Sequence, residues 1–121
     1  MTDAMHYVDH EPGAWFLVEQ QGILYLDARY SYSALIDDSA LIRLNEAELT
    51  AYRAGGHDYL SGLAQGIHNS APYRDESQYF GRNLYWDPDG KAYRDEVASA
   101  IADHTWIAEQ RTGRDGEARR E

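Results

Sequence analysis

Polar and apolar residues alternate along residues 23–32, and an alternation with a period of two is typical of a β-strand. One set of alternate positions is apolar or aromatic and is predicted to face the core: Leu24, Leu26, Ala28, Tyr30 and Tyr32. The other set is predicted to face water: Ile23, Tyr25, Asp27, Arg29 and Ser31. A second strand-like run begins at Ala14, and Gln20-Gln21-Gly22 between the two runs predicts a hairpin turn.

The next run, residues 33–44, repeats the letters SALI on either side of Asp37-Asp38. A tight hairpin at these two aspartates would give a sheet of four strands. A loop that leads into a single strand would give three. The pattern leaves both arrangements open, so it predicts an antiparallel sheet of three or four strands over about residues 14–44.

The run LIRLNEAELTAYRAGG predicts the end of a strand, a capped helix and a glycine stop. Asn45 is a favourable N-cap, because its side chain accepts a hydrogen bond from an amide in the first turn. Glu48 lies three residues later, where the carboxylate of a capping box reaches back. Gly55-Gly56 ends the helix, because glycine tolerates a left-handed backbone. These signals describe scaffold rather than a functional site.

Two more helices are predicted downstream. Apolar residues recur at helical spacing over about residues 58–68, and again over about residues 91–110 after the turn at Pro88-Asp89-Gly90. Residues 70–90 between them are aromatic, charged and aperiodic. A loop of this length in a small domain is usually functional or locally ordered.

These elements together predict a single α+β domain over residues 14–110. Its expected parts, in order, are the sheet (about 14–44), two short helices (about 46–55 and 58–68) and a longer C-terminal helix (about 91–110). Because the strands precede the helices, we expect the helices to pack on one face of the sheet. Residues 1–13 are predicted to be a flexible lead-in, and residues 111–121 a disordered charged tail.

The acidic composition limits the classes of partner. The chain has 121 residues, with 21 Asp or Glu against 11 Lys or Arg and a formal net charge of −10. Nucleic acids and anionic membranes require clustered basic residues, so we expect neither as a partner. An acidic body suits a basic protein partner, although net charge also serves solubility alone. The oligomeric state is left open.

Several chemistries are unfavourable on sequence grounds. There is no cysteine, which excludes thiol catalysis and Cys-ligated zinc. The first residues lack the apolar core of a signal peptide, and no apolar run approaches the roughly 20 residues of a membrane span, so we expect a cytoplasmic protein. His6 and His10 have a metal-binding spacing only if they lie on a helix, and none is predicted there. The calcium-loop pattern that begins at Asp87 has Ala98 at the position that requires Glu. We therefore predict no metal and no cofactor.

One candidate site for an enzyme or a small-ligand-binding domain lies on the strand at residues 23–32. Asp27 and Arg29 are two positions apart and share a face with Tyr25. Asp27 would act as a base and Arg29 would bind an anion, with His57 as a further group. The alternative is a solvent-exposed ion pair on an open sheet face, which contributes little to stability.

A second candidate surface is rich in aromatic residues and arginine, the types that dominate binding hot spots. Its members in and around the long loop are Tyr79, Phe80, Arg82, Tyr85, Trp86, Asp87 and Asp89. Trp106 is added because it falls off the apolar stripe of the last predicted helix. The pattern is equally compatible with a partner-binding surface and with a lid over a small core.

From GILYLDARYS through ALIRLNEAELTAYRAGGHDYLSGLAQGI the chain resembles a set of small bacterial proteins, over roughly residues 15–68. Some of these are similar to immunity proteins of toxin systems. The resemblance implies a protein that binds a cognate toxin and has no catalysis of its own. It covers scaffold positions, so it assigns no binding residue.

The leading hypothesis is a non-catalytic protein-binding domain that masks a basic partner by charge complementarity, of the immunity type. The second is an enzyme or ligand-binding domain that uses Asp27, Arg29 and His57, which requires these side chains to converge. The third is a self-associating structural protein with Trp106 at the contact. The sequence favours a binding protein over an enzyme.

Overall fold

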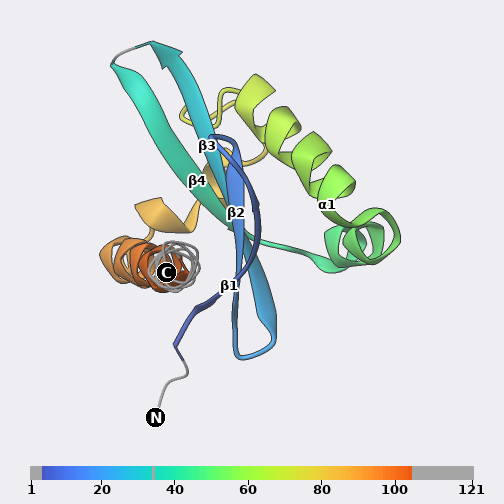
Figure 1. The fold of residues 1–121 in the computed structure, drawn as a ribbon. Coiled ribbons are helices and arrows are strands. Elements are labelled where there is room, and N and C mark those ends of the chain that lie inside the picture. The colour runs from blue at the N-terminus through green and yellow to red at the C-terminus, as the bar shows by residue number, and fades with distance from the viewer. Residues whose placement is uncertain (1–3, 34, 105–121) are drawn as a thin grey trace, which may run out of the picture.

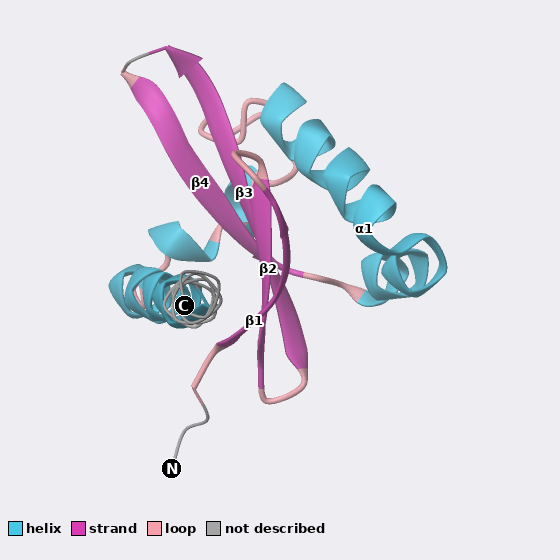
Figure 2. Cartoon of the chain, in the orientation of Figure 1, coloured by secondary structure: helices cyan, strands magenta, loops and turns pink. Residues whose placement is uncertain are grey.

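The computed structural model describes residues 4–33 and 35–104. Its centre is one antiparallel sheet of four strands in the order β1-β2-β3-β4, so that each strand pairs with the one before it in the chain (Figures 1 and 2). The strands are β1 (His6–Glu11), β2 (Trp15–Gln20), β3 (Ile23–Ser33) and β4 (Ile36–Arg43). The predicted α+β class and the hairpin turn at Gln20-Gln21-Gly22 are confirmed.

β1 lies within the segment that the sequence predicted to be a flexible lead-in, and that prediction is wrong for residues 6–11. This strand pairs with β2 from His6 opposite Glu19 to Glu11 opposite Trp15, with a bulge between Tyr7 and Asp9. Apart from Val8, its side chains are polar or aromatic, and none is buried. An edge strand of this kind is held by backbone pairing with its neighbour. It therefore shows no apolar alternation.

The run at residues 33–44 forms one strand rather than a hairpin. Asp37 and Asp38 lie inside β4, opposite Ser31 and Tyr30 of β3. The chain turns earlier, where the Ser33 hydroxyl oxygen accepts hydrogen bonds from the backbone N–H groups of the two residues that start the return. The sheet therefore has four strands because of β1, not because of a turn at the aspartates.

The first helix, α1 (Glu46–Asn69), begins at the predicted cap and is interrupted at Gly56. The Asn45 side chain accepts from the Glu48 N–H and the Glu48 carboxylate accepts from the Asn45 N–H, each at 2.9 Å. Gly56 has φ 60° and ψ −138°, which is not helical. Figure 1 shows that the two parts of α1 run in different directions. The two predicted short helices are therefore two segments joined at this glycine.

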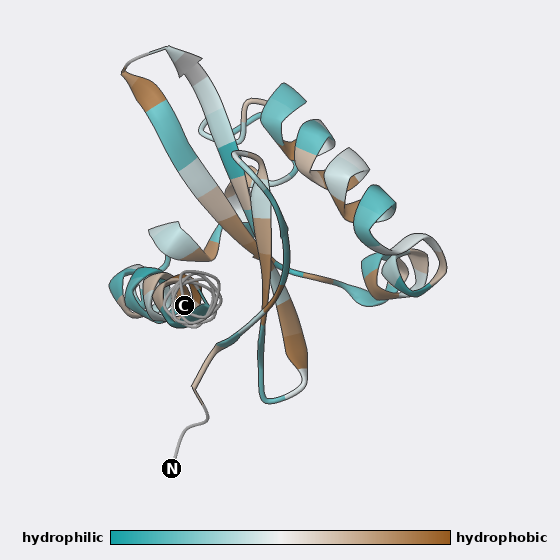
Figure 3. Ribbon diagram, in the orientation of Figure 1, coloured by the Kyte–Doolittle hydropathy of each residue, from teal (hydrophilic) through white to brown (hydrophobic). Residues whose placement is uncertain are grey.

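Helices cover both faces of the sheet, which corrects the prediction of one covered face (Figure 1). Leu60 and Ile67 of α1 pack in one apolar cluster with Leu26. The C-terminal helix, which is described over residues 90–104, packs Val97 against the opposite face. Both faces need covering because the strands carry apolar residues on each. In Figure 3 the hydrophobic parts of the central strands, coloured brown, lie between the helices.

The second apolar cluster contains Tyr25, which the sequence placed toward water. Tyr25 is 6% exposed and Leu41 is fully buried, and both pack with Val97 and Ala100 of the C-terminal helix. The Tyr32 side chain and the predicted helical residues after 104 lie outside what the structure describes. Within the described residues, no helix combines the length and apolarity that a bilayer crossing needs.

We expect the Gly56→Ala variant to lose about 1–3 kcal/mol of unfolding free energy, because an L-residue is strained at this positive φ. Gly62→Ala is the matched control. Gly62 lies in the regular second segment of α1 with open space at its Cβ position, so alanine is expected to stabilise it by about 0.5–1 kcal/mol. Urea unfolding of both variants checks this, and equal effects of the two would contradict the assigned break in α1.

Candidate functional site

The aromatic segment at residues 70–90 folds against the sheet and contains two short 3-10 helices, η1 (Phe80–Arg82) and η2 (Leu84–Trp86). Tyr79 and Tyr85 are each 8% exposed. Tyr79 joins the cluster under α1, and Tyr85 joins the cluster under the C-terminal helix. These two predicted contact residues therefore form part of a lid over the core.

Arg82, a third predicted contact residue, holds this segment to the start of α1. Its guanidinium donates to both carboxylate oxygens of Glu48, at 2.9 and 2.6 Å, and to the backbone carbonyl of Arg43 at 2.9 Å. Burial alone would raise the pKa of Glu48, but hydrogen bonds from Arg82 and from the Asn45 N–H outweigh it and keep the pKa below its usual value. The Glu48–Arg82 ion pair therefore links the helix cap, β4 and the long segment.

Asn83 covers the free edge of β4, the last strand of the sheet. It is 2% exposed, and its side-chain oxygen accepts from the backbone N–H groups of Leu41 and Tyr85, each at 3.1 Å. A strand edge with unpaired backbone groups invites pairing with another chain. The segment thus protects this edge and fixes the position of η2.

The remaining predicted contact residues of the segment are accessible. Trp86 is 42% exposed, and its ring meets that of Phe80 edge to face at 4.9 Å. Asp87 and Asp89 follow directly and are exposed. Their turn is fixed by Gly90, where an added Cβ would lie 2.0 Å from the Tyr85 carbonyl oxygen. Trp106 lies outside the described residues.

Asp27 is buried under the C-terminal helix, on a face that the sequence predicted to be open. Burial raises the pKa of Asp27, and the Tyr85 hydroxyl donates a hydrogen bond to its carboxylate. The Arg94 guanidinium lies 4.3 Å from the centre of the Tyr85 ring and pairs with Asp38 at 3.3 Å. Asp27 therefore joins a packed network of hydrogen bonds between β3 and the segment around η2.

The structure does not bring Asp27, Arg29 and His57 together. Arg29 forms an exposed ion pair with Asp37 at 3.0 Å. His57 belongs to α1, on the face of the sheet opposite to the helix that covers Asp27. A site built from all three side chains is therefore not formed.

His57 instead connects α1 to β1. Its Nδ1 lies 2.8 Å from an Asp9 carboxylate oxygen, its Nε2 lies 3.0 Å from one of Glu11, and its ring packs on Trp15 at 4.8 Å. Hydrogen bonds to Glu11 and Asp9 raise the pKa of His57. The imidazolium can donate from both nitrogens, which suits two carboxylate partners.

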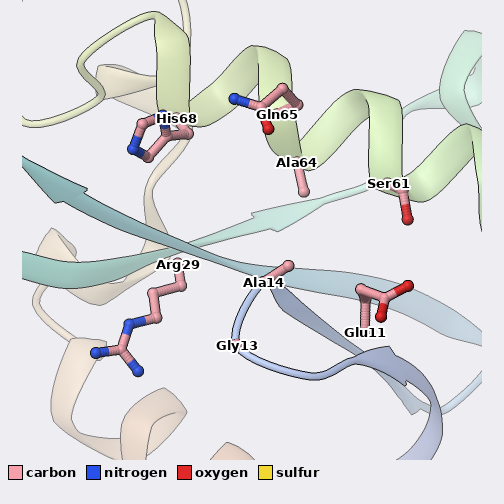
Figure 4. A pocket seen from close by; sticks show the side chains of 8 residues that line it. All are labelled: Glu11, Gly13, Ala14, Arg29, Ser61, Ala64, Gln65 and His68. Atoms are coloured by element: carbon pink, nitrogen blue, oxygen red, sulfur yellow. The ribbon is translucent and has the colours of Figure 1, made fainter.

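The largest cavity among those described measures about 400 Å³ and lies between α1 and the turn from β1 to β2 (Figure 4). Figure 4 shows Ser61, Gln65 and His68 along α1 above this turn, with the Arg29 side chain directed away from the helix. The polar groups are largely engaged: Ser61 accepts from the Trp15 ring N–H at 3.1 Å, and the other side chains have partners of their own. The cavity offers few free groups to a ligand.

Within the described residues, no three His, Cys, Asp or Glu side chains are arranged to hold a metal ion. Comparison with known proteins gave no match to any protein-family model, curated protein or solved structure. The resemblance to immunity proteins over residues 15–68 therefore stays a prediction.

Sequence reasoning missed three residues that shape this region, Asn83, Arg94 and Glu48 in its contact with Arg82. Glu48 was predicted only as a capping residue. Asn83 lies in an aperiodic run, and Arg94 lies at the border of the apolar stripe of a predicted helix. Their partners are 34 to 56 positions away in the chain, so no local spacing indicates them.

We expect Arg82→Met to lower the unfolding free energy by about 1–3 kcal/mol, because it leaves the nearly buried Glu48 carboxylate without its cation. Adding Glu48→Gln to this variant is expected to recover part of the loss, since no unpaired charge then remains. Lys91→Met, which breaks an exposed pair with Asp95, is the control and should change stability by under about 0.5 kcal/mol. Urea midpoints of the four proteins check the order.

The raised pKa of His57 predicts that its ion pairs stabilise the fold at low rather than high pH. Their contribution is complete below the unfolded value of about 6.5 and disappears as pH rises through the folded value. The melting temperature of the wild type should therefore exceed that of His57→Gln near pH 6, and the difference should shrink toward pH 9. A difference that grows with pH would contradict the assigned pairs.

Proposed function

We propose that the protein is a non-catalytic protein-binding domain that masks a basic surface of its partner. The carrying observation is the combination of exposed Trp86, supported by Phe80, with the exposed carboxylates of Asp87 and Asp89. We call Phe80, Trp86, Asp87 and Asp89 the Trp86 surface. An aromatic anchor beside charged groups is a common composition of a binding hot spot and its rim.

Rigidity supports the same proposal. Two anchors lie in the chain between Phe80 and Trp86 of this surface: the pair of Arg82 with Glu48 and the buried Asn83 side chain. A surface that is ordered before binding loses less conformational entropy when a partner docks. The carboxylates are expected to increase the rate of association with a basic partner and to repel an acidic one.

The finer proposal is that the partner is a toxin and that the domain acts as an immunity protein, which rests on the resemblance over residues 15–68. The excess of acidic residues, 21 against 11 basic ones, suits a basic target of this kind. The proposal leaves no role for the enzyme alternative, because the Asp27 carboxylate is occupied by Tyr85 and is separated from His57 by the sheet.

Affinity capture from native lysate with tagged wild type, Trp86→Ala and the double variant Asp87→Asn/Asp89→Asn tests the proposal. We expect one stoichiometric basic protein on the wild type. With that purified partner, calorimetry should show about 30-fold weaker binding by Trp86→Ala, the loss of about 2 kcal/mol typical of a hot spot. The double variant should mainly slow association and weaken its dependence on salt.

Asp75→Asn/Glu76→Gln is the matched control, because both side chains are exposed in the same segment and neither belongs to the Trp86 surface. It should bind like the wild type. Equal affinity of Trp86→Ala and the wild type for the captured partner would show that the interface lies elsewhere.

A further inference from the structure

A groove runs between the chain entering β1 and the C-terminal helix. It consists of two adjoining cavities of about 240 and 210 Å³, which share Met5 and Asp103 as lining residues. The floor is apolar: Met5 is 5% exposed and Ala100 is 3% exposed. The groove shares no residue with the Trp86 surface, so a ligand could bind in the groove whether or not that surface binds a partner.

One wall of the groove is a row of polar side chains on the C-terminal helix. Glu96, Ser99 and Asp103 follow the i, i+3, i+7 spacing that places residues on one helical face, and the two carboxylates are about 10 Å apart along the axis. Asp95 lies beside them at the rim. The opposite wall is formed by Ala4, His6 and Tyr7.

In the described structure, neighbouring groups balance the negative charge of these carboxylates only in part. Asp95 pairs at 3.4 Å with Lys91, whose side chain is 91% exposed, and such a pair contributes little. Glu96 accepts from the neutral Gln20 amide at 3.0 Å. Within the described residues, no basic side chain forms an ion pair with Glu96 or Asp103. His6 and His104 also line the adjoining cavity.

An apolar floor with an acidic wall matches one kind of side chain. Lysine and arginine bury an aliphatic stem and keep a charged head at the surface. A guanidinium fits better than an ammonium for two reasons. Its planar set of N–H donors can reach two carboxylates at once, and the guanidinium ion is more weakly hydrated than an ammonium ion. A carboxylate or phosphate would be repelled, and a wholly apolar side chain would leave the acids unpaired.

We propose that this groove is a docking site for an arginine side chain on an extended basic segment of a partner protein. The stem lies on Met5 and Ala100, and the guanidinium lies between Glu96 and Asp103 near Ser99. The residue next to the arginine faces the cavity at His6 and Tyr7, so the segment runs along the helix rather than across it.

The test is a titration of the full-length protein with the peptide acetyl-Leu-Arg-Leu-Arg-amide, followed by NMR of protein labelled with ¹³C in the methionine methyl groups. The chain has two methionines, and Met5→Leu identifies the Met5 signal by its loss. We expect a saturable shift of the Met5 methyl with the arginine peptide. The same peptide with citrulline in place of arginine should cause a shift at least about fivefold weaker at equal concentration, because the charge is absent.

Glu96→Gln/Asp103→Asn should bind the arginine peptide at least about fivefold more weakly, and Asp75→Asn/Glu76→Gln should bind it as the wild type does. The salt dependence of the wild type gives a readout without any variant, since raising NaCl from about 50 to about 500 mM should weaken binding by a similar factor. Equal shifts with the citrulline peptide, or full affinity of the groove variant, would overturn the proposal. Trp86→Ala should leave peptide binding unchanged, so failure here and failure of the Trp86 surface are distinguishable.

Discussion

The structure depends on the need to cover a sheet that is apolar on both faces. Leu26 and Tyr25 are neighbours in β3 and point to opposite faces, yet each is buried. One helix cannot cover two faces, so the chain must pass from one side of the sheet to the other after α1. The crossing segment is residues 70–90, and it has to run past the edge of β4. Most of what the segment contains serves that crossing.

The charges of the protein divide into those used inside the fold and those left at the surface. Glu48 with Arg82, and His57 with Asp9, tie segments that are distant in the chain. Such pairs form only when the tertiary fold brings the two partners together. Among the described residues, Asp87 and Asp89 of the Trp86 surface and Asp103 of the groove form no ion pair. Their charges would be available to the partner that we propose.

The candidate site could be predicted only in part from residue types. The concentration of Tyr, Trp and Arg in the 70–90 segment indicated the region that carries the exposed tryptophan. It did not separate the buried members Tyr79 and Tyr85 from exposed Trp86, because aromatic residues serve a core and an interface equally well. The sequence placed Asp27 and Arg29 on one face of β3 that was open to water, whereas Asp27 is buried. Whether that face is exposed to solvent depends on a helix about 70 positions later in the chain. The periodicity of a strand gives no information about such a distant element.

The sequence by itself determined the local elements: the hairpin at Gln20-Gln21-Gly22, the capping box at Asn45, the break at Gly56 and the long aperiodic segment. Each of these rests on contacts within a few residues or on a backbone preference, which a short window contains. Only the tertiary structure decided that residues 6–11 form a strand, that the helices lie on opposite faces and that Arg82 meets Glu48. Those outcomes depend on contacts between segments that are distant in the chain. The edge of the sheet can pair with β1, and the segment at residues 70–90 can bury side chains, only after the sheet has assembled.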